Sequence, residues 1–168
     1  MMAPTHVMLG VGLYATISVN FSNQAPLTAV TLAAAALGSL APDLDHPYSW
    51  LGKRLFFISI PLVTLIGHRG LTHSLIAAIV ATAGLAIYFH GGYAAWAIAF
   101  LVGYLSHLAA DWNTGGVPFL WPSRRSYAAP WSFPTGGILE RVFALCFAAG
   151  LLYLGAAFIK ENGFGVLL

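Results

Sequence analysis

Charged side chains are scarce in this chain of 168 residues: Asp, Glu, Lys and Arg together make up 7% of it. Ordinary soluble domains carry about a quarter. None occurs before Asp43, and none lies between Ser74 and Ala110. The second interval is long enough to cross a bilayer twice, because about 20 apolar helical residues cross it once. With 59% of its residues hydrophobic, the composition argues against a soluble domain and favours an integral membrane protein.

Cysteine is nearly absent as well. The one cysteine, Cys146, lies in an apolar run, which excludes a disulfide framework and a thiolate-rich metal site, and we expect it to be a small core residue. The formal net charge of +2 is small and scattered, so we expect no nucleic-acid partner. The sequence also lacks the H-E-x-x-H helix of zinc proteases and the G-x-S-x-G turn of serine hydrolases.

Six apolar runs separated by breaks rich in Pro, Gly or polar residues make up most of the sequence. We expect five of them to span the membrane, whereas run 55–67 is short and contains Pro61, which favours a re-entrant or interfacial helix. The pattern predicts an all-α, polytopic membrane protein with about five transmembrane helices, folded as a single domain over residues 1–168. The runs lie at 7–21, 25–41, 55–67, 74–90, 93–110 and 142–159.

Basic residues indicate the orientation. The loops on the side where the chain begins carry all of the Lys and Arg residues except Lys160, so the positive-inside rule places that side and the N-terminus in the cytoplasm. The C-terminus would then lie outside. The first run could instead be a secretory signal, but no basic stretch precedes it, so we expect it to remain in the protein. The basic residues on the cytoplasmic side are Lys53, Arg54, Arg69, Arg124, Arg125 and Arg141.

Histidine and aspartate are concentrated in four short clusters, which the predicted topology places at one face of the membrane. Ionisable groups at membrane depth are costly and usually face a cavity, a partner or an ion, so we expect one shared polar site. His90 lies on the opposite side, and we expect it to be a packing residue. The clusters are His6; Asp43, Asp45 and His46; His68 and His73; and His107 with Asp111.

Spacing within two of the clusters suits metal ligands. His107 and Asp111 are four apart near the end of a predicted helix, which places imidazole and carboxylate on one face about one turn apart. Asp43 and Asp45 lie between two prolines and would point the same way if the backbone were locally extended. His46 would then serve a second ion or a neighbouring carboxylate.

The third cluster begins the fourth apolar run. His68 and His73 flank Gly70, so a loop residue and a residue of the first helical turn could close around one centre, and either histidine could coordinate. Thr72 is expected to cap the helix that follows. Arg69 could hold a phosphate or a developing oxyanion, or pair with one of the aspartates.

Imidazoles and carboxylates without thiolates suit zinc first, with manganese or iron as alternatives. Eight candidates exceed one tetrahedral site, so we expect two or more ions. A bound ion lowers the pKa of its water and makes hydroxide available for hydrolysis, and an aspartate could serve as the base. Asp43, Asp45 and Asp111 are therefore the catalytic candidates together with Arg69.

The segments APDLDH, HRGLTHS and SHLAADWNTGG, in this order and preceded by His6, resemble the YdjM-like family of LexA-regulated, membrane-bound, metal-dependent hydrolases of bacterial inner membranes. The resemblance covers residues 1–125. It implies a multi-span helical protein of a bacterial inner membrane, distantly similar to zinc-dependent phospholipases C. The metal ligands that the resemblance implies are His6, Asp43, Asp45, His46, His68, His73, His107 and Asp111.

Together these observations predict a membrane-embedded hydrolase that cleaves a phosphoester or related bond in a lipid or lipid-linked substrate at the cytoplasmic face, with membrane lipids as partners. A metal-ion or proton transporter is an alternative, although the far face carries only His90 and Lys160. A non-catalytic scaffold with a structural metal is another. Glu140 and Glu161 lie outside the clusters, and we expect both at the interface or in solvent.

Overall fold

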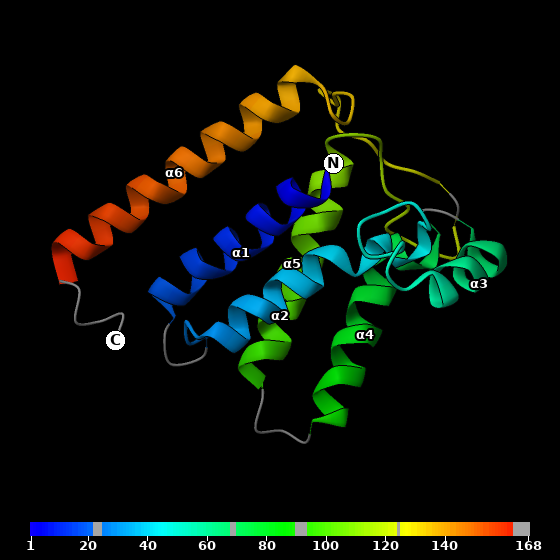
Figure 1. Ribbon diagram of the computed structural model, residues 1–168, viewed down its shortest axis with the longest axis horizontal. Helices are drawn as coiled ribbons and strands as arrows, with labels where there is room; N and C mark the ends of the chain where they lie inside the picture. Colours follow the sequence, from blue (N-terminus) through cyan, green and yellow to red (C-terminus); the bar gives the residue numbers. More distant parts are fainter. Residues whose placement is uncertain (22–24, 68–69, 90–93, 124, 163–168) are drawn as a thin grey trace.

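The computed structural model describes residues 1–21, 25–67, 70–89, 94–123 and 125–162 (Figure 1). Within these ranges the regular elements are helices, apart from one isolated β-bridge between Val117 and Tyr127. The prediction of an all-α protein is confirmed. In chain order the elements are α1 (Ala3–Asn20), α2 (Ala29–Leu40), the 3₁₀-helix η1 (Pro42–Asp45), α3 (Phe56–Ile66), the 3₁₀-helix η2 (Leu71–His73), α4 (Leu75–Tyr88), α5 (Ala94–Trp112) and α6 (Ile138–Asn162).

Side-chain caps set the starts of two helices. At the start of α2 the hydroxyl of Thr28 accepts from the backbone N–H of Thr31 at 3.1 Å, and the Thr31 hydroxyl accepts from the N–H of Thr28 at 3.0 Å. At the start of α4 the hydroxyl of Ser74 accepts from the N–H of Ala77 at 3.2 Å. Thr72 is not the cap that we expected, because it lies within η2, before this position.

Helices α1, α2 and α5 pack against one another, and glycines allow the closest approach. A Cβ atom at Gly38 would lie 2.0 Å from the carbonyl oxygen of Phe100, and one at Gly103 would lie 2.0 Å from that of Ala35. Both glycines therefore bring the backbones of α2 and α5 into contact, as small residues at helix interfaces do. Gly84 in α4 allows no such approach, because a Cβ atom there would meet nothing within 4 Å.

Helix α6 packs mainly against α1 and extends along the side of the bundle (Figure 1). Its segment Ile138–Ala157 is the one helix in the described part of the chain that is both long and apolar enough to cross a membrane. Phe56–Leu65 and Leu75–Tyr88 are apolar but shorter, so the expected number of spans stays a prediction. Cys146 lies on α6 and is exposed, because few side chains of other helices cover this helix; the expectation of a core residue is wrong.

The segments that carry the polar clusters meet at one end of the bundle. Helix α1 begins there, α2 ends there and leads into η1, α4 begins there after η2, and α5 ends there (Figure 1). The loop that follows α5 is tied to this end, since the N–H of Ala129 donates to the carbonyl of Trp112 at 2.9 Å and that of Leu75 to Phe119 at 3.1 Å. Residues far apart in the sequence therefore become neighbours.

Candidate metal centre

His107 and Asp111 lie one turn apart at the end of α5 and are 0% and 2% exposed. His107 Nε2 is 3.6 Å from Asp111 Oδ2, on the shared helix face that their spacing predicted. The Nδ1 atom of His107 lies 2.7 Å from the carbonyl oxygen of Ser39, in the last turn of α2. Because a carbonyl only accepts, Nδ1 carries the proton, and Nε2 is the ring atom that faces the carboxylate.

His6 joins this pair from α1. It lies in the first turn of the helix, which Pro4 helps to start. Its ring stacks on that of His107 with the centroids 3.7 Å apart and an interplanar angle of 12°, and its Nε2 lies 3.3 Å from Asp111 Oδ1. The ligand atoms of His6, His107 and Asp111 all lie within 4.8 Å of one another, which makes them a first candidate ligand group.

Asp43 and His73 complete a second group that also contains His107. Asp43 Oδ1 lies 3.7 Å from His107 Nε2 and 4.0 Å from His73 Nε2. The three ligand atoms again fall within 4.8 Å of one another. The side chain of Asp43 is 19% exposed whereas both histidines are fully buried, so Asp43 is the member of this group that solvent reaches.

Asp45 lies on the other side of His73. Its Oδ2 is 3.3 Å from His73 Nδ1 and accepts a hydrogen bond from the Thr72 hydroxyl, while His73 Nε2 faces Asp43 and lies 3.6 Å from Asp111 Oδ2. A carboxylate on one ring nitrogen orients a histidine that binds a metal through the other. We expected Asp43 and Asp45 to point the same way from extended backbone. This is wrong because η1 is a 3₁₀-helix, in which residues two apart lie on different sides.

The distances within the cluster suit a divalent ion. Six ligand atoms of five side chains, counting both Asp111 oxygens, are separated by 3.3 to 4.0 Å in the pairs given above. Two atoms bound to one tetrahedral zinc at about 2.0–2.1 Å lie about 3.3–3.4 Å apart. Lone pairs of neutral imidazoles repel carboxylates in a buried site unless a cation lies among them. The residues therefore fit a metal ion that prefers nitrogen and oxygen ligands.

Of the remaining predicted site residues, one lies at the edge of the cluster and two lie outside the residues that the structure describes. His46 is partly exposed, and its Nδ1 accepts from the N–H of Tyr48 at 3.1 Å. With Asp43 and Asp111 it lines a pocket of about 450 Å³, which we call the polar pocket. In the described ranges His46 does not belong to either ligand group. The predicted residues His68 and Arg69, with Arg124 and His90, lie outside the described residues.

Two groups beside the cluster were not expected from the sequence. The amino group of Met1 lies 2.6 Å from Asp111 Oδ1. Glu140 is fully buried and accepts from the backbone N–H groups of Met2 and Gly136, both at 2.7 Å. The expectation that Glu140 is interfacial or solvated is wrong, because the start of α6 packs beside the start of α1, which is far away in the sequence. A lone glutamate in the first turn of an apolar helix is the signal that could have found it.

Sequence comparisons agree with the resemblance that these residues suggested. A family profile described as "YdjM inner membrane protein" matches residues 1–165. The chain belongs to the YdjM family. It is therefore a membrane protein, and the family description supports a location in the inner membrane. No solved structure matches it.

The relatives cover the chain to different extents. The proteins named inner membrane protein YdjM of Escherichia coli (strain K12) and Shigella flexneri are each 43% identical over 116 residues, which are 66% of this chain and 59% of theirs. The chain thus spans less than two thirds of the length of these two relatives. Uncharacterized protein YvsG of Bacillus subtilis (strain 168) is 27% identical over 165 residues, which are 94% of this chain and 100% of YvsG.

Proposed function

We propose that this membrane protein is a metal-dependent hydrolase that cleaves a phosphoester or related bond in a lipid or lipid-linked substrate at the cytoplasmic face of the inner membrane. One observation carries the proposal: His and Asp side chains from four separate segments converge in a buried cluster beside the polar pocket. Ionisable groups buried in a membrane protein are costly, and they are kept where they bind or react. The converging residues are His6, Asp43, His73, His107 and Asp111.

These five side chains would hold the metal, and Asp45 would orient His73. We propose zinc, because the ligands are nitrogen and oxygen atoms; manganese and iron accept the same set. When bound, such an ion supplies Lewis acidity and lowers the pKa of water. Both ligand groups contain His107. Its Nδ1 donates a hydrogen bond to the carbonyl of Ser39, so only Nε2 can bind a metal, and it can bind one ion only. A second ion, which we also propose, would use ligands from the rest of the cluster.

Asp43 is the residue best placed to accept a proton, because it is partly exposed and lines the polar pocket. In hydrolysis the oxygen of water bonds to phosphorus while the ester P–O bond breaks. The proton that water loses passes to Asp43 and then to the ester oxygen, which leaves as an alcohol. Asp111, with its Oδ2 3.6 Å from Nε2 of both His73 and His107, would bind an ion together with these two rings. We propose that Arg69 contacts the phosphate.

The metal site can be tested by elemental analysis of the full chain purified in detergent. We expect zinc, manganese or iron in the wild-type protein. His107→Ala and Asp43→Ala should bind that metal at least about tenfold more weakly and therefore contain less of it after purification. Cys146→Ala is the matched control, because this residue lies exposed on α6 away from the cluster. Metal content that is unchanged in both cluster variants would overturn the site.

Activity requires a separate assay. The protein is reconstituted in vesicles, incubated with phospholipids and lipid diphosphates, and the products are identified by mass spectrometry with and without a chelator. A product that disappears with the chelator and in Asp43→Ala supports the hydrolase. Metal bound tightly without any product across these substrates would instead favour a structural metal in a scaffold.

A further inference from the structure

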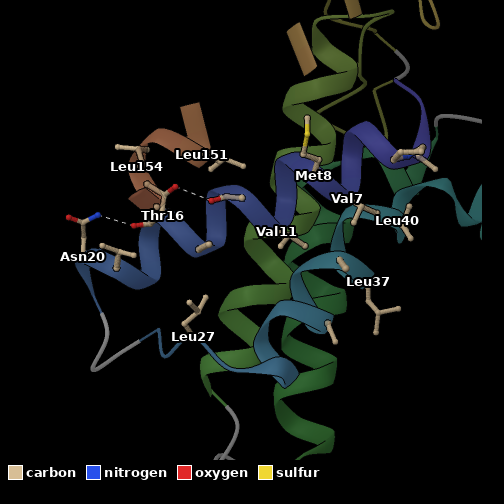
Figure 2. A pocket seen from close by; sticks show the side chains of 18 of the residues that line it. Val7, Met8, Val11, Thr16, Asn20, Leu27, Leu37, Leu40, Leu151 and Leu154 are labelled. Atoms are coloured by element: carbon tan, nitrogen blue, oxygen red, sulfur yellow. Dashed lines mark hydrogen bonds between the residues drawn. The ribbon is translucent and has the colours of Figure 1, made fainter. Parts of the chain in front are cut away.

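A large apolar groove runs along α1. Its floor is the face of α1 that points away from α5, and its walls are parts of α2 and α6 (Figure 2). Val7 and Val11 lie on the floor, Leu37 on one wall and Leu151 and Leu154 on the other. The groove has a volume of about 1350 Å³. Pockets for drug-sized ligands have about 300–1,000 Å³, so the groove is larger than a small soluble ligand needs.

The lining of the groove makes no polar demand on an occupant. None of its residues is charged at neutral pH. Its two residues with hydrogen-bonding side chains on the α1 face, Thr16 and Asn20, donate to carbonyls of their own helix: Thr16 to Gly12 at 2.9 Å and Asn20 to Thr16 at 2.8 Å (Figure 2). The surface that remains consists of apolar side chains, the aromatic Trp50 among them, and glycine. Such a surface suits a hydrocarbon chain.

One end of the groove adjoins the polar pocket. Ala3 and Trp50 line both of them. The polar pocket carries Asp43, His46 and Asp111, two of which belong to the candidate metal ligands. An amphiphile could therefore place a polar group beside the metal cluster and its apolar chain along α1 without crossing a barrier of the opposite polarity.

The length of the groove also fits. Its α1 floor runs from Ala3 to Asn20, and these positions span about 25 Å at about 1.5 Å per residue. One leaflet contributes about half of a hydrocarbon core about 30 Å thick, so an acyl chain of that leaflet reaches a depth of about 15 Å in the bilayer. The groove can accommodate the whole chain.

We propose that this groove binds one acyl chain of a phosphate-bearing glycerolipid whose headgroup phosphate lies in the polar pocket. The inference rests on the proposed function and narrows its substrate to a lipid that enters sideways from the bilayer, between α2 and α6. The occupant is a phospholipid with at least one long acyl chain. A lipid of the general bilayer that merely covers α6 would make no use of the polar pocket.

The test uses a pair of matched variants on α6. Gly150 and Gly155 are both exposed, and a Cβ atom at either would meet nothing within 4 Å, but only Gly155 lines the groove. Gly155→Phe should fill the groove without a clash, whereas Gly150→Phe adds the same side chain outside it. A phenylalanine that displaces two or more buried methylenes should lower acyl-chain binding about tenfold.

The full chain is reconstituted in nanodiscs of phosphatidylethanolamine and phosphatidylglycerol that contain a phosphatidylglycerol probe with a diazirine in one acyl chain. After illumination, labelled peptides are mapped by mass spectrometry. We expect labels on the groove residues of α1 and on residues 151–157, about tenfold fewer on α1 in Gly155→Phe, and no change in Gly150→Phe. Excess phosphatidylglycerol should compete for this label better than diacylglycerol, which lacks the phosphate. Equal labelling of the two variants, or labels spread evenly over all exposed helices, would overturn the groove assignment.

Failure of the groove and failure of the hydrolase give different results. If the protein is not a hydrolase, the probe still labels the groove, but no chelator-sensitive product forms from any substrate. If the groove is not the acyl site, chelator-sensitive hydrolysis of long-chain phospholipid is the same in Gly155→Phe and Gly150→Phe. If both proposals hold, Gly155→Phe raises KM for the long-chain lipid and leaves hydrolysis of a water-soluble phosphodiester and the metal content unchanged.

Discussion

Replacing Gly103 by alanine should push α2 and α5 apart. A Cβ atom at this position would lie 2.0 Å from the carbonyl oxygen of Ala35, and ordinary contact begins at 3.4 Å, so the helices must separate by about 1.4 Å. Because the obstacle is backbone, no side-chain rotation relieves it. Overpacking costs about 1–3 kcal/mol, whereas alanine gains up to about 1 kcal/mol over glycine inside a helix, so we expect a net loss of up to about 2 kcal/mol of unfolding free energy.

The same separation should weaken metal binding. Gly103 lies one turn before His107 on α5, and His107 Nδ1 donates to the carbonyl of Ser39 on α2 at 2.7 Å. A displacement of about 1.4 Å would take this pair beyond the range of about 2.7–3.2 Å for a good hydrogen bond. His107 would lose the partner that sets its tautomer and ring orientation. Loss of such a partner lowers metal affinity about 10–100-fold.

Gly84→Ala is the matched control. Gly84 also lies inside a helix, α4, but a Cβ atom there would meet nothing within 4 Å. Thermal unfolding in detergent and competition for zinc with a chromophoric chelator measure the two effects. Gly103→Ala should unfold at a lower temperature and bind zinc more weakly, and Gly84→Ala should equal the wild type in zinc affinity and match or exceed it in stability. Wild-type behaviour of Gly103→Ala in both assays would refute the argument that the α2–α5 contact positions His107.

Three further predictions concern the surroundings of the cluster. Asp45→Asn should lower zinc affinity at least about tenfold, because a neutral amide orients His73 less firmly; chelator competition measures this, and an unchanged affinity would exclude the orienting role. Glu140→Gln should lower the free energy of unfolding by about 1–2 kcal/mol, since the two backbone N–H groups that donate to the carboxylate lose a charged partner; equilibrium unfolding measures the loss, and full wild-type stability would contradict it. Treatment with a chelator should lower the unfolding temperature of the wild type, and zinc at about 100 times its Kd should restore about 2.7 kcal/mol; a temperature that does not respond to either would argue against a resident ion.

The helices could be predicted because their apolar runs are long and the breaks between them are rich in Pro, Gly and polar residues. The ends were less accurate where capping decides them. Helix α2 begins at Ala29 and not at residue 25, since Thr28 and Thr31 satisfy each other's backbone N–H groups. Helix α6 begins at Ile138, four residues earlier than its apolar run, where Glu140 is held by the backbone N–H of Gly136. The number of spans depends on the bilayer and stays a prediction.

Much of the candidate site could be predicted, because charged side chains are rare in this chain and His and Asp gather at the ends of apolar runs. What could not be predicted is the division of tasks among them. Asp45 orients His73 and does not point with Asp43, because the backbone of η1 turns between them. Glu140 belongs beside the cluster only through the contact between the starts of α1 and α6, and no local pattern records such a contact.

A cluster of ionisable groups in a bundle with so little charge also predicts that folding and metal binding are coupled. The buried imidazoles of His6, His73 and His107 lie 3.3 to 4.0 Å from carboxylate oxygens of Asp43 and Asp111. The Met1 amino group contacts Asp111, and the remaining groups are unfavourable in an apolar bundle unless a further cation offsets them. Their ligand atoms come from four segments that meet only when the bundle is formed, so the unfolded chain cannot bind the ion with comparable affinity. The free energy of binding then becomes part of the free energy of folding. Consequently, a variant that loosens α2 from α5 should lose less stability in the presence of a chelator than in excess zinc, because only the second measurement contains the lost binding energy.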